Sequence, residues 1–183
     1  MKKLLLPLLV FFCISTTQAQ DRQGYQNPAV DERIPLEENL RQPSAEALQA
    51  TLYELISQRQ AVQQAHWNVQ GPLFYSLHDL LGHFYEALGP KIDMIAERQL
   101  ALGVPADGRP NAVASAADLE PVPEGYLDDQ QVLDLLTARY KTISDRLSKR
   151  IDATSDDPVT QDMLIDVTGT IDDQLWKLRA FQR

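Results

Sequence analysis

Four long stretches of the chain repeat apolar residues at three- and four-residue steps, which is the spacing of one face of an α-helix. The predicted helices cover residues 44–70, 74–100, 128–153 and 158–181. Ser44 follows Pro43 and is a preferred cap, so we predict that the first helix begins there. Gly71-Pro72 should end it, because proline cannot extend a helix. Asp157 and Pro158 similarly predict a cap and a first-turn proline for the fourth helix.

The second stretch contains Gly89-Pro90 near its middle. A proline there removes one backbone hydrogen bond and crowds the preceding turn, which predicts a kink. The apolar pattern resumes in register after Pro90, so we expect one kinked helix rather than two helices.

A long connection, residues 101–126, separates the second and third helices and holds four prolines. We expect one short helical turn within it, near residues 112–117. No strand pattern of comparable length competes with the helices. Four long helices with a long crossover between the second and third are typical of a ferritin-like four-helix bundle. The sequence therefore predicts an all-α bundle domain over residues 44–183.

The start of the chain has the pattern of a secretory signal peptide. Lys2 and Lys3 precede an eleven-residue apolar run, residues 4–14, which is shorter than the ~20 residues that span a bilayer. Small residues at Thr17 and Ala19 fit a peptidase site, so we expect a leader of residues 1–19, export, and most simply a periplasmic location. Lipid attachment at Cys13 is a weaker alternative, because a bulky phenylalanine precedes it.

Residues 20–43 are polar, carry three prolines and are predicted to form a mobile or loosely docked arm. The formal net charge of the whole chain is −9, and loss of the leader's two lysines makes it −11. This charge opposes nucleic-acid binding, which needs Lys and Arg at phosphates, and favours cations. No second apolar run is long enough to cross a membrane, so we expect a soluble mature protein.

Three histidines and two carboxylates are the candidates for metal chemistry: His66, His78, His83, Asp93 and Glu97. Asp93 and Glu97 are four residues apart and share one helix face, where they could grip a cation. His78 precedes Asp93 by 15 residues, which is ~22 Å along a helix. His78 therefore cannot share a metal with Asp93 and Glu97 of its own chain. Either no joint site exists, or two chains related by a two-fold axis bring the ligands together.

Each of these residues also has an ordinary structural interpretation. A histidine at a helix end is more often hydrogen-bonded than metal-bound, and a carboxylate pair four residues apart is usually a solvated face. Spacing alone leaves both interpretations open.

The sequence motifs around these residues are more specific than their spacing. The motifs are His66-Trp67-Asn68-Val69-Gln70-Gly71-Pro72, Phe74, Leu77-His78 and Asp93-Met94-Ile95-Ala96-Glu97-Arg98. Together they closely resemble the Dps family of mini-ferritins, the DNA-protection-during-starvation proteins, over roughly residues 44–181.

The resemblance implies a hollow dodecamer with ferroxidase centres at its two-fold interfaces. Family members oxidise Fe(II), typically with hydrogen peroxide, and store ferric mineral, which protects against oxidative stress. Carried over by position, His66 and His78 would bind iron from one chain, and Asp93 and Glu97 from its neighbour. Trp67 would sit close to the centre.

The chain departs from the family pattern at Gly82, where an acidic residue usually follows the second histidine by four positions. His83 is adjacent but points ~100° away around the helix, and Glu86 is a further turn along. The Gly89-Pro90 pair is a second departure, because a kink could shift Asp93 and Glu97. A lysine-rich tail is also absent, which with the negative charge argues against DNA binding.

Three functions thus stay open: an exported ferroxidase and iron store, a metal-sequestering or structural shell with little turnover, and a DNA-condensing protein. An ordinary ferritin is disfavoured, since no Glu-x-x-His pair occurs on the predicted helices. Four acids near the start of the fourth helix could line an iron path, or could simply cap the helix and face solvent: Asp156, Asp157, Asp162 and Asp166.

Overall fold

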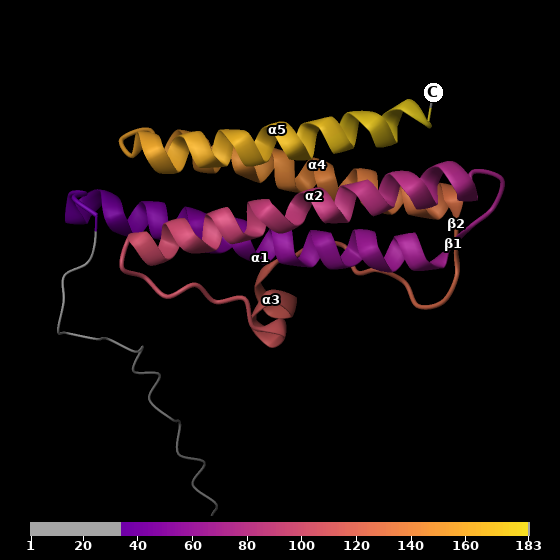
Figure 1. Ribbon diagram of the computed structural model, residues 1–183, viewed down its shortest axis with the longest axis horizontal. Helices are drawn as coiled ribbons and strands as arrows, with labels where there is room; N and C mark the ends of the chain where they lie inside the picture. The colour runs from indigo at the N-terminus through magenta and orange to yellow at the C-terminus, as the bar shows by residue number, and fades with distance from the viewer. Residues whose placement is uncertain (1–33, 183) are drawn as a thin grey trace, which may run out of the picture. The chain divides into compact units, whose positions relative to one another are not determined.

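The computed structural model describes residues 34–182, so the predicted signal peptide and residues 20–33 of the predicted arm lie outside the described part. In chain order the elements are α1 (Glu38–Asn68), β1 (Val69–Gln70), α2 (Phe74–Ala101), α3 (Pro110–Ala116), β2 (Leu127–Asp128), α4 (Asp129–Ala153) and α5 (Pro158–Ala180). Figure 1 shows the four long helices side by side, with α3 carried on the crossover beside α1. The predicted all-α bundle with a long crossover is confirmed.

Leucine-rich faces of the four long helices form the core. The pairs α1–α2 and α4–α5 make the most extensive contacts, and α1 also contacts α4. Fully buried core residues include Leu48, Leu55, Leu81, Leu88, Ile95, Leu136, Tyr140, Ile143, Leu164 and Ile171. Among the described residues, no helix is both long and apolar enough to cross a bilayer.

Helix α2 continues through Gly89-Pro90, as the sequence pattern predicts. Leu88 before the proline and Ile95 after it are both fully buried, so the same face meets the core on either side. The two halves of α2 therefore keep one register, and the axial distance between His78 and Asp93 is preserved. The kink itself stays a prediction.

The predicted start of the first helix at Ser44 is wrong, because α1 begins at Glu38 and includes Pro43. The buried guanidinium of Arg41 explains the earlier start. It donates hydrogen bonds to the carbonyl oxygens of Ile34 (3.2 Å), Leu36 (2.8 Å) and Leu102 (3.0 Å). This arginine docks the first turns of α1 and the segment before them against the end of α2, so residues 34–43 are not a loose arm.

The crossover from α2 to α4 is fixed at both ends. Near its start, Gln49 of α1 donates to the Asp107 carbonyl (2.8 Å) and accepts from the Asp107 amide (2.9 Å). Near its end, β2 pairs in parallel with β1, with Val69 opposite Leu127. The expected short helical turn is confirmed as α3, but strands of two residues each are too short to give a sequence pattern.

A buried ion pair joins α2 to the start of α5. Arg98 and Asp157 are 7% and 2% exposed, and Arg98 Nη2 donates to both carboxylate oxygens of Asp157 (2.9 and 3.1 Å). Asp157 also caps α5 by accepting from the Thr160 amide (3.2 Å), and it accepts from the Ser44 hydroxyl (2.8 Å). Burial raises the pKa of Asp157, but the hydrogen bonds from Thr160 and Ser44 and the charge of Arg98 outweigh it and hold that pKa below its usual value.

We expect Asp157→Asn to lower the free energy of unfolding by about 3–5 kcal/mol at neutral pH, because it leaves the buried Arg98 charge without its partner. Because the folded-state pKa is depressed, this stability is fully present above the unfolded pKa of ~3.9 and is lost as the pH falls through the folded value. Urea unfolding of wild type and variant at a fixed protein concentration, from pH 7 downward, measures both effects. Asp156→Asn, at the exposed neighbour, should change stability by less than about 0.5 kcal/mol. An equal loss in the two variants would contradict the ion-pair argument.

Candidate metal centre

His66 and His78 come together where the chain turns from α1 into α2. His66 lies in the last turn of α1, and His78 lies in the second turn of α2. Their rings stack with centroids 3.8 Å apart and planes 22° apart. Both side chains are half-buried, so the pair is held firmly while one edge stays open to solvent or to another subunit.

Each histidine is fixed by the backbone of the other. His66 Nδ1 lies 2.7 Å from the carbonyl oxygen of His78, and His78 Nδ1 lies 2.9 Å from the carbonyl oxygen of His66. A carbonyl can only accept, so each Nδ1 must carry the hydrogen. In the neutral rings the Nε2 atoms then hold free lone pairs, which is the form that binds a metal. The residues present thus fit a cation.

The turn between the histidines depends on Gly71 and Asp129. Gly71 has φ +124°, and a Cβ there would lie 2.9 Å from Asp129 Oδ2. The same carboxylate oxygen accepts from the Leu73 amide (3.1 Å) just before α2 begins. Asp129 stands in the first turn of α4, so it holds the loop that brings His78 to His66. Sequence reasoning missed this role, since an acid at a helix start indicates only capping.

Position 82 faces the histidine pair. A Cβ built on Gly82 would lie 3.5 Å from His66 Cε1, an ordinary van der Waals distance. A side chain would therefore fit there, and its absence leaves that side of His66 open. Tyr85 on the next turn meets the His66 ring edge-on at 5.4 Å, and sequence reasoning did not single it out.

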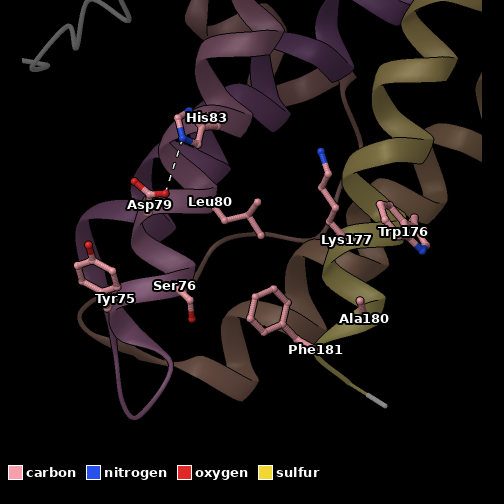
Figure 2. A pocket seen from close by; sticks show the side chains of 9 residues that line it. All are labelled: Tyr75, Ser76, Asp79, Leu80, His83, Trp176, Lys177, Ala180 and Phe181. Atoms are coloured by element: carbon pink, nitrogen blue, oxygen red, sulfur yellow. Dashed lines mark ion pairs between the residues drawn. The ribbon is translucent and has the colours of Figure 1, made fainter.

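His83 lies apart from the pair. Its Nε2 is 3.7 Å from Asp79 Oδ2, and both side chains are largely exposed. Figure 2 shows them on one wall of a hollow whose other wall includes Trp176 and Phe181 of the C-terminal region. His83 therefore cannot replace an acid at Gly82 without leaving this position.

Asp93 and Glu97 are exposed on the second half of α2. They line an open hollow of about 500 Å³ together with Pro90, Met94, Arg98, Ala101 and Met163. Within the described part of the chain, no group of three or more His, Cys, Asp or Glu side chains could hold a metal together. One chain thus presents a histidine pair and a separate carboxylate pair, as the spacing predicts, and each pair alone is an incomplete site.

Comparison with known proteins identifies the family. The ferritin-like domain family matches residues 45–183. The chain is 42% identical over 139 residues to DNA protection during starvation protein 2 of Deinococcus radiodurans, covering 75% of this chain and 58% of that relative's length. It is 35% identical to the DNA protection during starvation protein of Agrobacterium fabrum, over 73% of this chain and 83% of the relative. The chain belongs to the Dps family.

A solved Dps structure from Deinococcus radiodurans superposes with a TM-score of 0.77 at 40% identity, covering 78% of this chain and 87% of that one. The ferritin-like fold predicted from the helix pattern is therefore confirmed. The assignment of His66, His78, Asp93 and Glu97 as iron ligands stays a prediction, as does the closeness of Trp67 to the centre.

The four acids around the start of α5 in this Dps protein divide into different roles. Asp157 is the buried cap described above and does not line a path for iron. Asp166 forms an ion pair with Lys91 at 2.5 Å. Asp156 and Asp162 are exposed, and an iron path along them stays a prediction.

We expect Gly71→Ala to destabilise this Dps protein by about 1–3 kcal/mol, because alanine at positive φ is strained and its Cβ would press on Asp129. The shifted turn should also weaken binding of Fe(II) at the histidine pair. Thermal unfolding and anaerobic Fe(II) titration measure the two effects. Gly169→Ala is the matched control: it is helical with open space around it, so it should raise stability by up to about 1 kcal/mol. Equal thermal midpoints for both variants would contradict the role of the turn.

Proposed function

We propose that this Dps protein is exported, binds and oxidises Fe(II) with hydrogen peroxide, and stores ferric iron inside a hollow dodecamer. The observation that carries the proposal is the stacked His66–His78 pair, whose Nδ1 atoms are tied to carbonyl oxygens and whose Nε2 lone pairs are free. Such a pair fixes the tautomer and direction of two imidazole ligands before any metal arrives.

The rest of each centre comes from a second subunit. Two copies related by a two-fold axis would each offer their histidines to the other's Asp93 and Glu97, so that one interface contains two centres. Trp67 follows His66 and is 63% exposed, which is unusual for so large an apolar side chain and fits a surface that another subunit covers.

The chemistry follows from electron counting. Each Fe(II) gives one electron, and one peroxide takes two electrons and two protons to yield two waters. A centre that presents two Fe(II) to one peroxide therefore avoids releasing hydroxyl radical. Here the imidazoles orient the iron, while the carboxylates of the partner offset its growing positive charge. The ferric product would collect on interior carboxylates, which removes both iron and peroxide.

The alternative is a shell that sequesters metal with little turnover. Its basis is Gly82, which leaves the open side of His66 without an acidic ligand. One iron would still meet two imidazoles and two carboxylates, whereas a second would depend largely on water. DNA condensation is not proposed, since the formal charge of −9 repels phosphate.

We expect anaerobically loaded wild type, given a peroxide pulse, to develop ferric absorbance at least about tenfold faster than free Fe(II). His66→Ala should abolish that advantage, because it removes an imidazole ligand. Gly82→Asp should raise the number of tightly bound Fe(II) per centre, since position 82 faces His66, and Gly82→Asn controls for size without charge. Wild-type oxidation no faster than in solution, rescued by Gly82→Asp, would favour the sequestering shell.

Complementation tests whether the site is shared. A His66→Ala chain and an Asp93→Asn chain each lack active centres alone. Where the two variants share an interface, one of its two centres combines the intact histidines of one chain with the intact carboxylates of the other. Random mixing of equal amounts makes about half of the interfaces mixed, so roughly a quarter of the wild-type rate should return. No recovery in the mixed assembly would exclude a centre built from two chains.

We expect export to remove residues 1–19. Expressed with its full sequence in a Gram-negative host, the protein should appear in the periplasmic fraction with Gln20 as its first residue, measured by intact mass and N-terminal sequencing. Replacing Lys2 and Lys3 by Glu should retain it in the cytoplasm, because the basic start of a leader is needed for translocation. A cytoplasmic wild-type chain of full length would disprove export.

A further inference from the structure

Two methionines share the hollow that Asp93 and Glu97 line. Met94 comes from α2 and Met163 from α5, so two separate helices bring sulfur to the carboxylates. The chain has three methionines, and the third is Met1. Every methionine beyond the start residue thus lies beside the predicted iron ligands.

Both side chains are reachable from the hollow. They are partly buried and lie against the hydrophobic core on one side, while the other side lines the open space. Methionine commonly fills irregular gaps in a core, so packing alone would explain a methionine whose thioether was fully buried. A partly exposed thioether next to a site that receives peroxide is also a reductant, because peroxide converts it to a sulfoxide.

Gly82 makes such a reductant useful, because a centre without an acidic ligand at this position would often hold only one Fe(II). Where only one Fe(II) occupies a centre, iron provides one electron although peroxide needs two to become water. A thioether supplies both electrons at once, so the iron stays Fe(II). The O–O bond breaks, one oxygen bonds to sulfur, and the other leaves as water with both protons. The sum is one thioether and one peroxide giving one sulfoxide and one water, with no radical released.

We propose that Met94 and Met163 are a sacrificial site that is oxidised to sulfoxide when peroxide meets an incompletely filled iron centre. The inference rests on the proposed function, since iron at Asp93 and Glu97 is what directs peroxide to this hollow. Proximity then makes the two methionines react ahead of any thioether in solution.

The test measures sulfoxide directly. Assembled mature protein is loaded anaerobically with Fe(II) equimolar to the chains, mixed with N-acetylmethionine equimolar to its methionines, and given substoichiometric peroxide. Peptide mass spectrometry should find sulfoxide at Met94 and Met163 at least about tenfold above the free thioether, with no such excess in iron-free protein. In Gly82→Asp loaded with two Fe(II) per chain, the excess should fall below that of wild type loaded alike, because a second iron held in the centre supplies the second electron.

A conservative double variant, Met94→Leu with Met163→Leu, keeps the side-chain volume and should fold normally by circular dichroism. Its peroxide damage should move to aromatic side chains such as Tyr85 and Trp67. Normal ferric absorbance with methionine oxidation no greater than that of N-acetylmethionine would overturn the inference and leave the function standing. Iron oxidation no faster than in free solution would instead remove the proposed function, and the inference with it.

Discussion

The two hydrogen bonds between the His66 and His78 rings and each other's backbone are the constraint on which the candidate centre depends. They close the turn between α1 and α2, the two helices with the most extensive mutual contact. They also fix the tautomer, because a carbonyl accepts only from a protonated Nδ1. One pair of contacts thus sets both the register of two helices and the direction of two lone pairs.

The carboxylate pair is held by different means. Asp93 and Glu97 are exposed, but Arg98 beside them is buried and bound to Asp157, the cap of α5. This ion pair fixes the second half of α2 against α5, which carries Met163 into the same hollow. The histidine half relies on backbone carbonyls and the carboxylate half on a buried charge, so perturbing one need not disturb the other.

Apolar periodicity was sufficient to predict the four long helices, because each buries one continuous face. It was not sufficient at the start of α1, where Pro43 looked like a boundary and Arg41 binds the Leu102 carbonyl 61 positions later in the chain. Spacing correctly separated His78 from Asp93, since that distance follows from helical rise alone. The stacking of the histidines could not be predicted, because it depends on Asp129 of α4 holding a loop that precedes it by more than fifty residues.

Glycine at position 82 has opposite effects on structure and on chemistry. Within a helix it costs up to about 1 kcal/mol relative to alanine, and space for a side chain exists beside His66. The fold therefore gains nothing from it. In the proposed centre, the missing carboxylate also leaves one negative charge fewer to offset a second Fe(II). The two positions of that centre should therefore bind iron with unequal affinity. An unequal centre is the condition under which a two-electron reductant such as Met94 or Met163 becomes useful. In the proposed two-chain centre, the glycine of one subunit thus acts together with the methionine hollow of its partner, because Met94 of the same chain lies 12 residues, or ~3 turns, further along α2.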